Sequence, residues 1–177
     1  MDEFIKKHIS IVNKNNNLII YIGNSSYNTF DTKISKKEIS NFITKLYNKY
    51  PHIKKFKVNK NKKIYKNKNI IIETCNKSYE CYSYTVTNSK TFSFNTRDVK
   101  MNIIKKEHQD ECNPSCFDYN YIENIENIKI DIQNIFNIVI TNIHYDSESW
   151  FKLAIEIKKP NDPEKLYLKI KSILEML

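Results

Sequence analysis

Several residues of this chain have side chains that could bind a metal ion. His108, Cys112 and Cys116 each lie four positions apart, and imidazole and thiolate are preferred zinc ligands. The spacing is not that of a standard zinc pair and Pro114 lies between the cysteines, so we interpret the segment as a loop and assign no metal. Four carboxylates nearby could hold a divalent cation, but we interpret them as a solvated acidic patch. They are Asp110, Glu111, Glu123 and Glu126.

A second group of residues could bind nucleic acid. Residues 54–68 are rich in lysine, and Tyr79, Tyr82 and Tyr84 could stack on the bases of a single strand. The formal net charge of +9 favours a phosphate-rich partner such as RNA or a triphosphate. Two plainer interpretations stand beside this one: the tyrosines pack within a sheet, and the lysines reflect an Asn- and Ile-rich composition. Arg97 is the single arginine, retained although the composition of the chain favours lysine as the basic residue.

The single glycine, Gly23, excludes several phosphate-binding and nucleophilic motifs. A P-loop, a dinucleotide fingerprint and a nucleophile elbow all need glycines where the backbone approaches a ligand or turns sharply.

Helices are predicted at both ends and in the first third of the chain. Ser35 and Glu38 form a capping box, and apolar residues at helical spacing follow until Pro51, so we predict a helix over residues 36–50. Asp162 followed by Pro163 predicts the start of a helix that runs to the C-terminus. A short helix is expected within residues 2–12.

Strands are predicted for most of the remaining sequence. Residues 18–22 form the first strand, residues 121–145 are rich in strands, and residues 150–158 alternate cleanly. Between them, Asn/Lys/Ser segments such as Asn76-Lys77 and Asn88-Ser89 separate β-branched and aromatic runs at residues 54–58, 62–66, 69–75, 79–87, 90–95 and 98–106. This succession favours an α+β fold with an antiparallel meander or barrel and flanking amphipathic helices.

The length of 177 residues fits one domain, and no linker or repeat divides residues 1–177. We expect no signal peptide and no membrane span, and we interpret the four cysteines as reduced thiols of a cytoplasmic protein.

In order and spacing, these elements resemble the metal-dependent RNA 5′-triphosphatases of mRNA capping, which belong to the CYTH superfamily of triphosphate tunnel folds. The family's first strand reads E-x-E-x-R-x-G, and here residues 17–23 lead through Ile34-Ser35 into the helix. Residues 98–102 and 138–141 are similar to two middle strands of the family. The family's E-x-E-x-E strand before a closing helix corresponds to residues 152–156.

The resemblance also implies what this copy lacks. The family's first-strand glutamate positions are Asn17 and Ile19, and its arginine position is Tyr21. In the last strand, Lys152 and Ala154 replace two of the three glutamates. One remaining carboxylate cannot offset the dehydration of a divalent ion. The residual family position is Glu156, and the candidate phosphate- or RNA-binding residues are Arg97, Lys100, Lys152 and Lys158.

We therefore predict a viral-type triphosphatase-like protein that has lost catalysis and needs no cofactor. Its partners would be RNA, a triphosphate or proteins of capping and transcription, in the cytoplasm of a host or in a virion. A second interpretation is an active Mg- or Mn-dependent triphosphatase in which other acids converge, namely Glu73, Glu80, Glu107 and Glu156. A third is an unrelated basic module with an open sheet.

Overall fold

A computed structural model describes residues 1–8, 12, 16–27, 29–65, 70–75, 78–94, 97–109, 121–145, 147–157 and 162–177. Three helices lie in this part of the chain: α1 (Asp2–His8), α2 (Lys36–Lys49) and α3 (Pro163–Leu174). Its strands are β1 (Asn16–Ser26), β2 (Thr29–Asp31), β3 (Lys54–Tyr65), β4 (Ile70–Cys75), β5 (Ser78–Phe94), β6 (Arg97–His108), β7 (Tyr121–Ile132), β8 (Phe136–Tyr145) and β9 (Glu148–Ile157).

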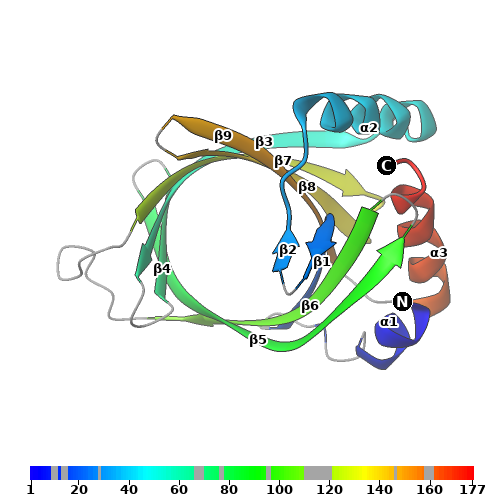
Figure 1. Cartoon of the computed structure of the whole chain (residues 1–177), viewed down its shortest axis with the longest axis horizontal. Helices are drawn as coiled ribbons and strands as arrows, with labels where there is room; N and C mark the ends of the chain where they lie inside the picture. Colours follow the sequence, from blue (N-terminus) through cyan, green and yellow to red (C-terminus); the bar gives the residue numbers. More distant parts are fainter. Residues whose placement is uncertain are drawn as a thin grey trace.

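Eight of the strands form a closed antiparallel barrel. Their order is β1-β6-β5-β4-β3-β7-β8-β9, and β9 pairs back with β1 to close the ring seen in Figure 1. In the closing pair, Ile19 lies opposite Glu156 and Tyr21 lies opposite Ala154. Strand β2 is outside the ring and pairs with the end of β1. The predicted α+β architecture with a tunnel-like barrel is confirmed, and an open sheet is excluded.

Helices α2 and α3 begin where their capping residues predict. The Ser35 hydroxyl accepts the N–H of Glu38 at 3.2 Å, and the Glu38 carboxylate accepts the N–H of Ser35 at 3.1 Å, which completes the capping box of α2. Asp162 accepts the N–H groups of Glu164 and Lys165 at the start of α3. Helix α1 spans Asp2–His8, within the segment predicted to be helical, and residues 9–11 lie outside the described part.

The hydrophobic core lies between the barrel and the helices rather than inside the barrel. The helices gather on one side of the ring (Figure 1) and bury apolar residues such as Phe42 and Leu46 of α2. Outward-facing residues of the strands complete this core, among them Ile20 of β1 and Leu153 and Ile155 of β9. Because successive residues of a strand face opposite sides, the other face of each strand is left to line the interior.

Two predicted strand breaks are wrong. The segments predicted at 54–58 and 62–66 belong to one strand, β3, which ends at Tyr65 and stays paired with β7 along its length. Those predicted at 79–87 and 90–95 belong to β5, which ends at Phe94 and in which a change of register between Val86 and Asn88 absorbs the polar pair Asn88-Ser89. The side-chain amide of Asn88 contacts His8 Nε2 at 2.8 Å.

The expectation of four reduced thiols is also wrong, since Cys81 is disulfide-bonded and a disulfide takes up two thiols. Its partner is not among the described side chains. Cys112 and Cys116 lie outside the described residues, as do Asp110 and Glu111. Among the described helices, none combines the length and the apolar character needed to cross a membrane.

Candidate functional site

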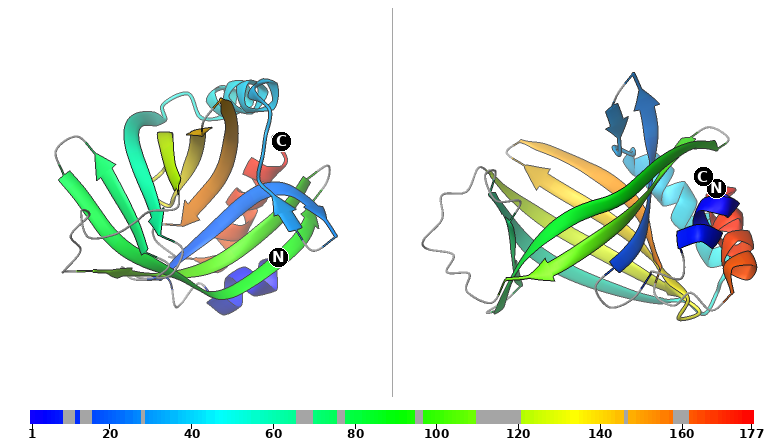
Figure 2. Two further views of the ribbon diagram at one scale, coloured as in Figure 1. Left: turned by 60° about the vertical axis from the view of Figure 1, so that its left-hand side comes forward. Right: turned by 90° about the horizontal axis from the view of Figure 1, so that it is seen from below.

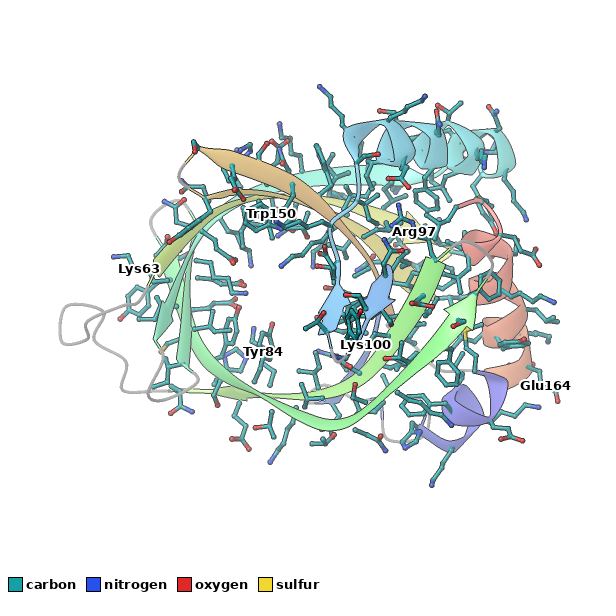
Figure 3. The ribbon with its side chains drawn as sticks, in the orientation of Figure 1. Lys63, Tyr84, Arg97, Lys100, Trp150 and Glu164 are labelled. Carbon is teal, nitrogen blue, oxygen red and sulfur yellow. The ribbon has the colours of Figure 1, made fainter. Side chains whose placement is uncertain are left out.

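The barrel encloses a cavity of about 670 Å³ to which each of its eight strands contributes side chains. Strands that contribute several residues do so at alternate positions, as strand geometry requires, with the exception of Ile157 next to Glu156 at the end of β9. Its charged lining residues are Lys60, Lys62, Lys106, Lys129, Lys152, Glu73, Glu123 and Glu156. Lysines therefore outnumber glutamates five to three in the described lining. Figure 3 shows side chains entering the opening from all around the ring.

Two of the glutamates are held by lysines. Lys60 Nζ lies 2.8 Å from Glu73 Oε2, and Lys129 Nζ lies 3.3 Å from Glu156 Oε2. Burial by itself would raise the pKa of Glu73, but the Lys60 hydrogen bond and charge outweigh burial, and the net effect lowers that pKa. Glu73 is therefore a carboxylate whose charge is already balanced by a neighbouring ammonium group.

The charge of Lys152, in the last strand β9, is less well balanced by neighbouring carboxylates. Lys152 is half-buried, and no described residue forms an ion pair with it. Burial lowers the pKa of Lys152 and the charge of Lys62 adds to that effect, while the charges of Glu123 and Asp31 oppose it. Lys62 and Glu123 face each other in the β3–β7 register. A ligand anion placed here would offset the burial of two lysine charges.

Three tyrosines add neutral hydroxyl groups to the interior. Burial, aided by the charge of Glu156, raises the pKa of Tyr21 to about 12. Burial likewise raises the pKa of Tyr84 to about 12 and that of Tyr82 further still. The rings of Tyr82 and Tyr84 are 4.8 Å apart, and Lys106 Nζ lies 4.0 Å from the centre of the Tyr82 ring. Tyr84 points into the opening (Figure 3).

The structure brings together some of the candidate residues and separates others. Lys152 and Glu156 line the cavity, whereas Lys100 lies near its end with its ammonium 5.8 Å from the Phe30 ring. Arg97 forms an ion pair with Glu38 of α2 and is not part of the cavity lining. Lys158 lies outside the described residues.

The alternative set of acids converges only in part. Glu73 and Glu156 line the cavity, whereas Glu80 pairs with Lys106 and Glu107 pairs with Lys105. Neither Glu80 nor Glu107 is among the lining residues.

Glu123 is a cavity residue that the sequence interpretation missed. It is only 9% exposed, not part of a solvated patch as expected. The sequence carries no clear signal for this placement, because apolar residues recur every third position from Ile122 to Ile128 rather than alternating. Lys60, Lys62 and Lys106 likewise lie in polar runs, and the strand pairing places them in the cavity.

The described lining does not suit the divalent metal that the resemblance implies. The inward positions of β1 and β9 hold a single carboxylate, that of Glu156, and it already forms an ion pair with Lys129. The other inward residues of these two strands are Asn17, Ile19, Tyr21, Lys152 and Ala154. Among the described residues, no group of three or more His, Cys, Asp or Glu side chains converges as a metal site would require.

Comparison with known proteins places this barrel among the tunnel folds. No family model matches the sequence, and no curated protein sequence gives a significant match. The S. pombe RNA triphosphatase Pct1 is similar in structure, with a TM-score of 0.75 at 10% identity over 98% of this chain and 84% of that chain. Pct1 in complex with the Spt5 CTD gives a TM-score of 0.75 at 9% identity, covering 98% and 85% of the two chains.

The RNA triphosphatase domain of a trifunctional mimivirus mRNA capping enzyme is also similar. Its TM-score is 0.62 at 12% identity over 99% of this chain and 95% of that domain. Identities this low establish the fold alone. The chain has the triphosphate tunnel fold of RNA triphosphatases, which confirms the fold that the sequence resemblance predicted.

Proposed function

We propose that the barrel binds the 5′-triphosphate end of RNA in its cavity without metal-dependent hydrolysis. One observation carries the proposal: lysine and neutral residues occupy the inward positions of β1 and β9. Only Glu156 remains of the acids that the family resemblance implies there, and Lys129 pairs with it. The barrel has kept the shape of a triphosphate tunnel while its lining has changed from an acidic to a basic one.

The lining can bind a polyphosphate directly. Ammonium groups act as point charges that donate hydrogen bonds to phosphate oxygens, and those bonds are stronger where water is partly excluded. Lys62, Lys106 and Lys152 reach the cavity from three different strands. The hydroxyls of Tyr21 and Tyr84 stay protonated at neutral pH because their pKa values are about 12. They can therefore donate hydrogen bonds to phosphate oxygens without adding charge.

A protein that binds this end without cleaving it would act as a binding or scaffolding subunit. The S. pombe relative has been solved with the Spt5 CTD, a segment of another protein. By analogy, we propose that the present chain works alongside proteins of capping or transcription. The helix-covered side of the barrel is separate from the cavity (Figure 1), so it could contact a protein while RNA occupies the interior.

A second candidate function is an active phosphohydrolase with displaced acids. It is favoured by the presence of Glu73, Glu123 and Glu156 in one cavity. It requires a metal ion to displace Lys60 from Glu73 and Lys129 from Glu156, which means separating two existing ion pairs.

Calorimetric titration with tripolyphosphate in the presence of EDTA tests the proposal. We expect binding by the wild-type protein, and we expect Lys62→Met and Lys152→Met each to weaken it about tenfold to a hundredfold, the value of one charged hydrogen bond. Lys171→Met on the outer helix α3 is the matched control and should leave the affinity unchanged. Equal losses in the control, or no binding without Mg²⁺ or Mn²⁺, would contradict the proposal.

A further inference from the structure

The two mouths of the barrel differ in their described side chains. At one mouth the β1–β2 hairpin extends beyond the ring, as Figure 2 shows in the right-hand view. The chain then returns along the start of β9, where Ile34 pairs with Phe151. We call this opening the hairpin mouth, and its rim consists of Tyr27, Phe30, Lys33, Lys100, Trp150 and Lys152.

Aromatic side chains gather at the hairpin mouth together with lysines. The Phe30 ring lies close over the backbone of Gly23, which faces the same side of β1 as Tyr21. Lys100 Nζ is 5.8 Å from the Phe30 ring, and Lys33 Nζ is 5.0 Å from the Trp150 ring. The label in Figure 3 places Trp150 on the inner side of β9. Flat aromatic faces flanked by cations are the components of a platform for single-stranded nucleic acid.

The tip of the hairpin carries a further aromatic group that packing does not explain. Tyr27 is fully exposed and has a φ of 52°, a left-handed conformation that asparagine or glycine would adopt more easily. A bulky residue at such a position contributes nothing to the core. Its ring is available to a ligand that approaches the mouth.

The three carboxylates of the hairpin mouth keep their charge, but each has a hydrogen-bond donor or a lysine beside it. Asp31 accepts the N–H of Lys33 at 2.8 Å, and Asp98 accepts the N–H of Ser25 at 2.7 Å. Glu148 lies 4.0 Å from Lys33 Nζ. By contrast, Lys100 and Lys152 form no ion pair with any described residue.

Toward the opposite mouth, the aromatic side chains that lie with a lysine are less accessible: Lys106 Nζ lies over the ring of the fully buried Tyr82, beside Tyr84. Lys105 and Lys106 pair there with Glu107 and Glu80. Tyr79 is exposed at the start of β5, but strand alternation places it on the outer face, opposite to the inward Tyr84.

We propose that single-stranded RNA enters the barrel through the hairpin mouth, where its first nucleotides stack on Phe30, Trp150 and Tyr27. This inference rests on the proposed function, since it assumes that the triphosphate end occupies the cavity. The rim recognises the bases through stacking, which tolerates any sequence, and the cavity recognises the phosphates. A duplex end, whose bases are already stacked on one another, should bind more weakly than a single strand.

Two probes separate the rim from the cavity: tripolyphosphate alone and a short single-stranded RNA with a 5′-triphosphate. Binding of fluorescein-labelled RNA is followed by anisotropy, and tripolyphosphate is measured by calorimetry. Tyr27→Ala and Phe30→Ala should each weaken RNA binding about fivefold or more while leaving tripolyphosphate affinity unchanged. Tyr79→Ala, at the opposite mouth, is the matched control and should change neither. Because Tyr27 is fully exposed, its variant tests the idea even if Phe30→Ala disturbs the hairpin.

The single tryptophan gives an independent signal, because Trp150 is the only one in the chain. RNA should quench its emission in a saturable manner through stacking of a base. Wild-type affinity in both Tyr27→Ala and Phe30→Ala, equal losses for the two probes, or a loss with Tyr79→Ala would overturn the inference. Failure of tripolyphosphate to bind, with RNA binding still dependent on the rim, would instead refute the proposed function and leave the rim assignment standing.

Discussion

Replacing Gly23 with alanine should detach β2 from the barrel and leave the eight-stranded ring intact. A Cβ atom at this position would lie 2.0 Å from the backbone oxygen of Asp31 and 2.9 Å from Cε1 of Phe30. The Phe30 ring could rotate away, but the Asp31 oxygen belongs to the backbone of β2. The strand itself must therefore move by at least about 1 Å to reach an ordinary contact distance.

The cost follows from what holds β2 in place. Three residue pairs join β1 and β2, beginning at Asn24 and Asp31. At about 0.5–1.5 kcal/mol for each hydrogen bond lost, and with the released backbone regaining conformational freedom, the free energy of unfolding should fall by about 1 to 2 kcal/mol. For a chain of this size, that loss lowers the Tm by roughly 2 to 8 °C.

Thermal unfolding followed by circular dichroism measures the stability change, and the two ligand titrations measure its functional effect. The variant should bind tripolyphosphate like the wild type and bind triphosphate-ended RNA more weakly, because Phe30 is displaced from the hairpin mouth. Asn24→Ala, on the neighbouring exposed position, is the matched control and should be close to neutral. An unchanged Tm together with unchanged RNA binding would refute the reasoning, and so would loss of the β-sheet spectrum.

Three further predictions concern stability. Lys152→Met should raise the free energy of unfolding by about 1 kcal/mol even as it weakens polyphosphate binding, because it removes a half-buried charge; a lower Tm would contradict this. Glu38 accepts hydrogen bonds from Ser35 and Arg97, which lower its pKa from 4.5 to about 2. The stabilisation by the Glu38 carboxylate is therefore complete above pH 4.5 and is lost as the pH falls toward 2. Glu38→Gln should flatten that part of the curve of stability against pH. The change should be at most about 1 kcal/mol, since the Glu38 side chain is 45% exposed. Phe42→Ala should cost about 3–5 kcal/mol in urea unfolding, because the ring is buried between α2 and the barrel.

The parts of the fold with local signals could be predicted from the sequence. The starts of α2 and α3 could be predicted because helix capping depends on neighbouring residues alone. The signals are Ser35 with Glu38 for α2 and Asp162 with Pro163 for α3. The inward placement of Lys152 and Glu156 followed from the alternation of residues 150–158. The family resemblance then supplied the closure of the barrel.

What could not be predicted depends on partners distant in sequence. Polar residues at 59–61 suggest a turn, but pairing with β7 holds them in β3. Arg97 was a candidate for phosphate binding, yet it pairs with Glu38, which is 59 positions away. Glu123 was interpreted as solvated because the loop before it is acidic, and only the β3–β7 register shows that it faces Lys62. The disulfide of Cys81 could not be predicted either, since the sequence alone does not show which cysteines pair.

Phosphate release from triphosphate-ended RNA tests the central claim most directly, with binding followed in the same samples. The reaction is run in EDTA, in Mg²⁺ and in Mn²⁺, at two salt concentrations. The lysine-lined cavity predicts binding that persists in EDTA and is not strengthened by Mg²⁺ or Mn²⁺, weaker binding at the higher salt concentration, and no release of γ-phosphate. Metal-dependent release would contradict the claim and would identify Glu73, Glu123 and Glu156 as metal ligands, with Glu73 and Glu156 exchanging their lysine partners for a cation.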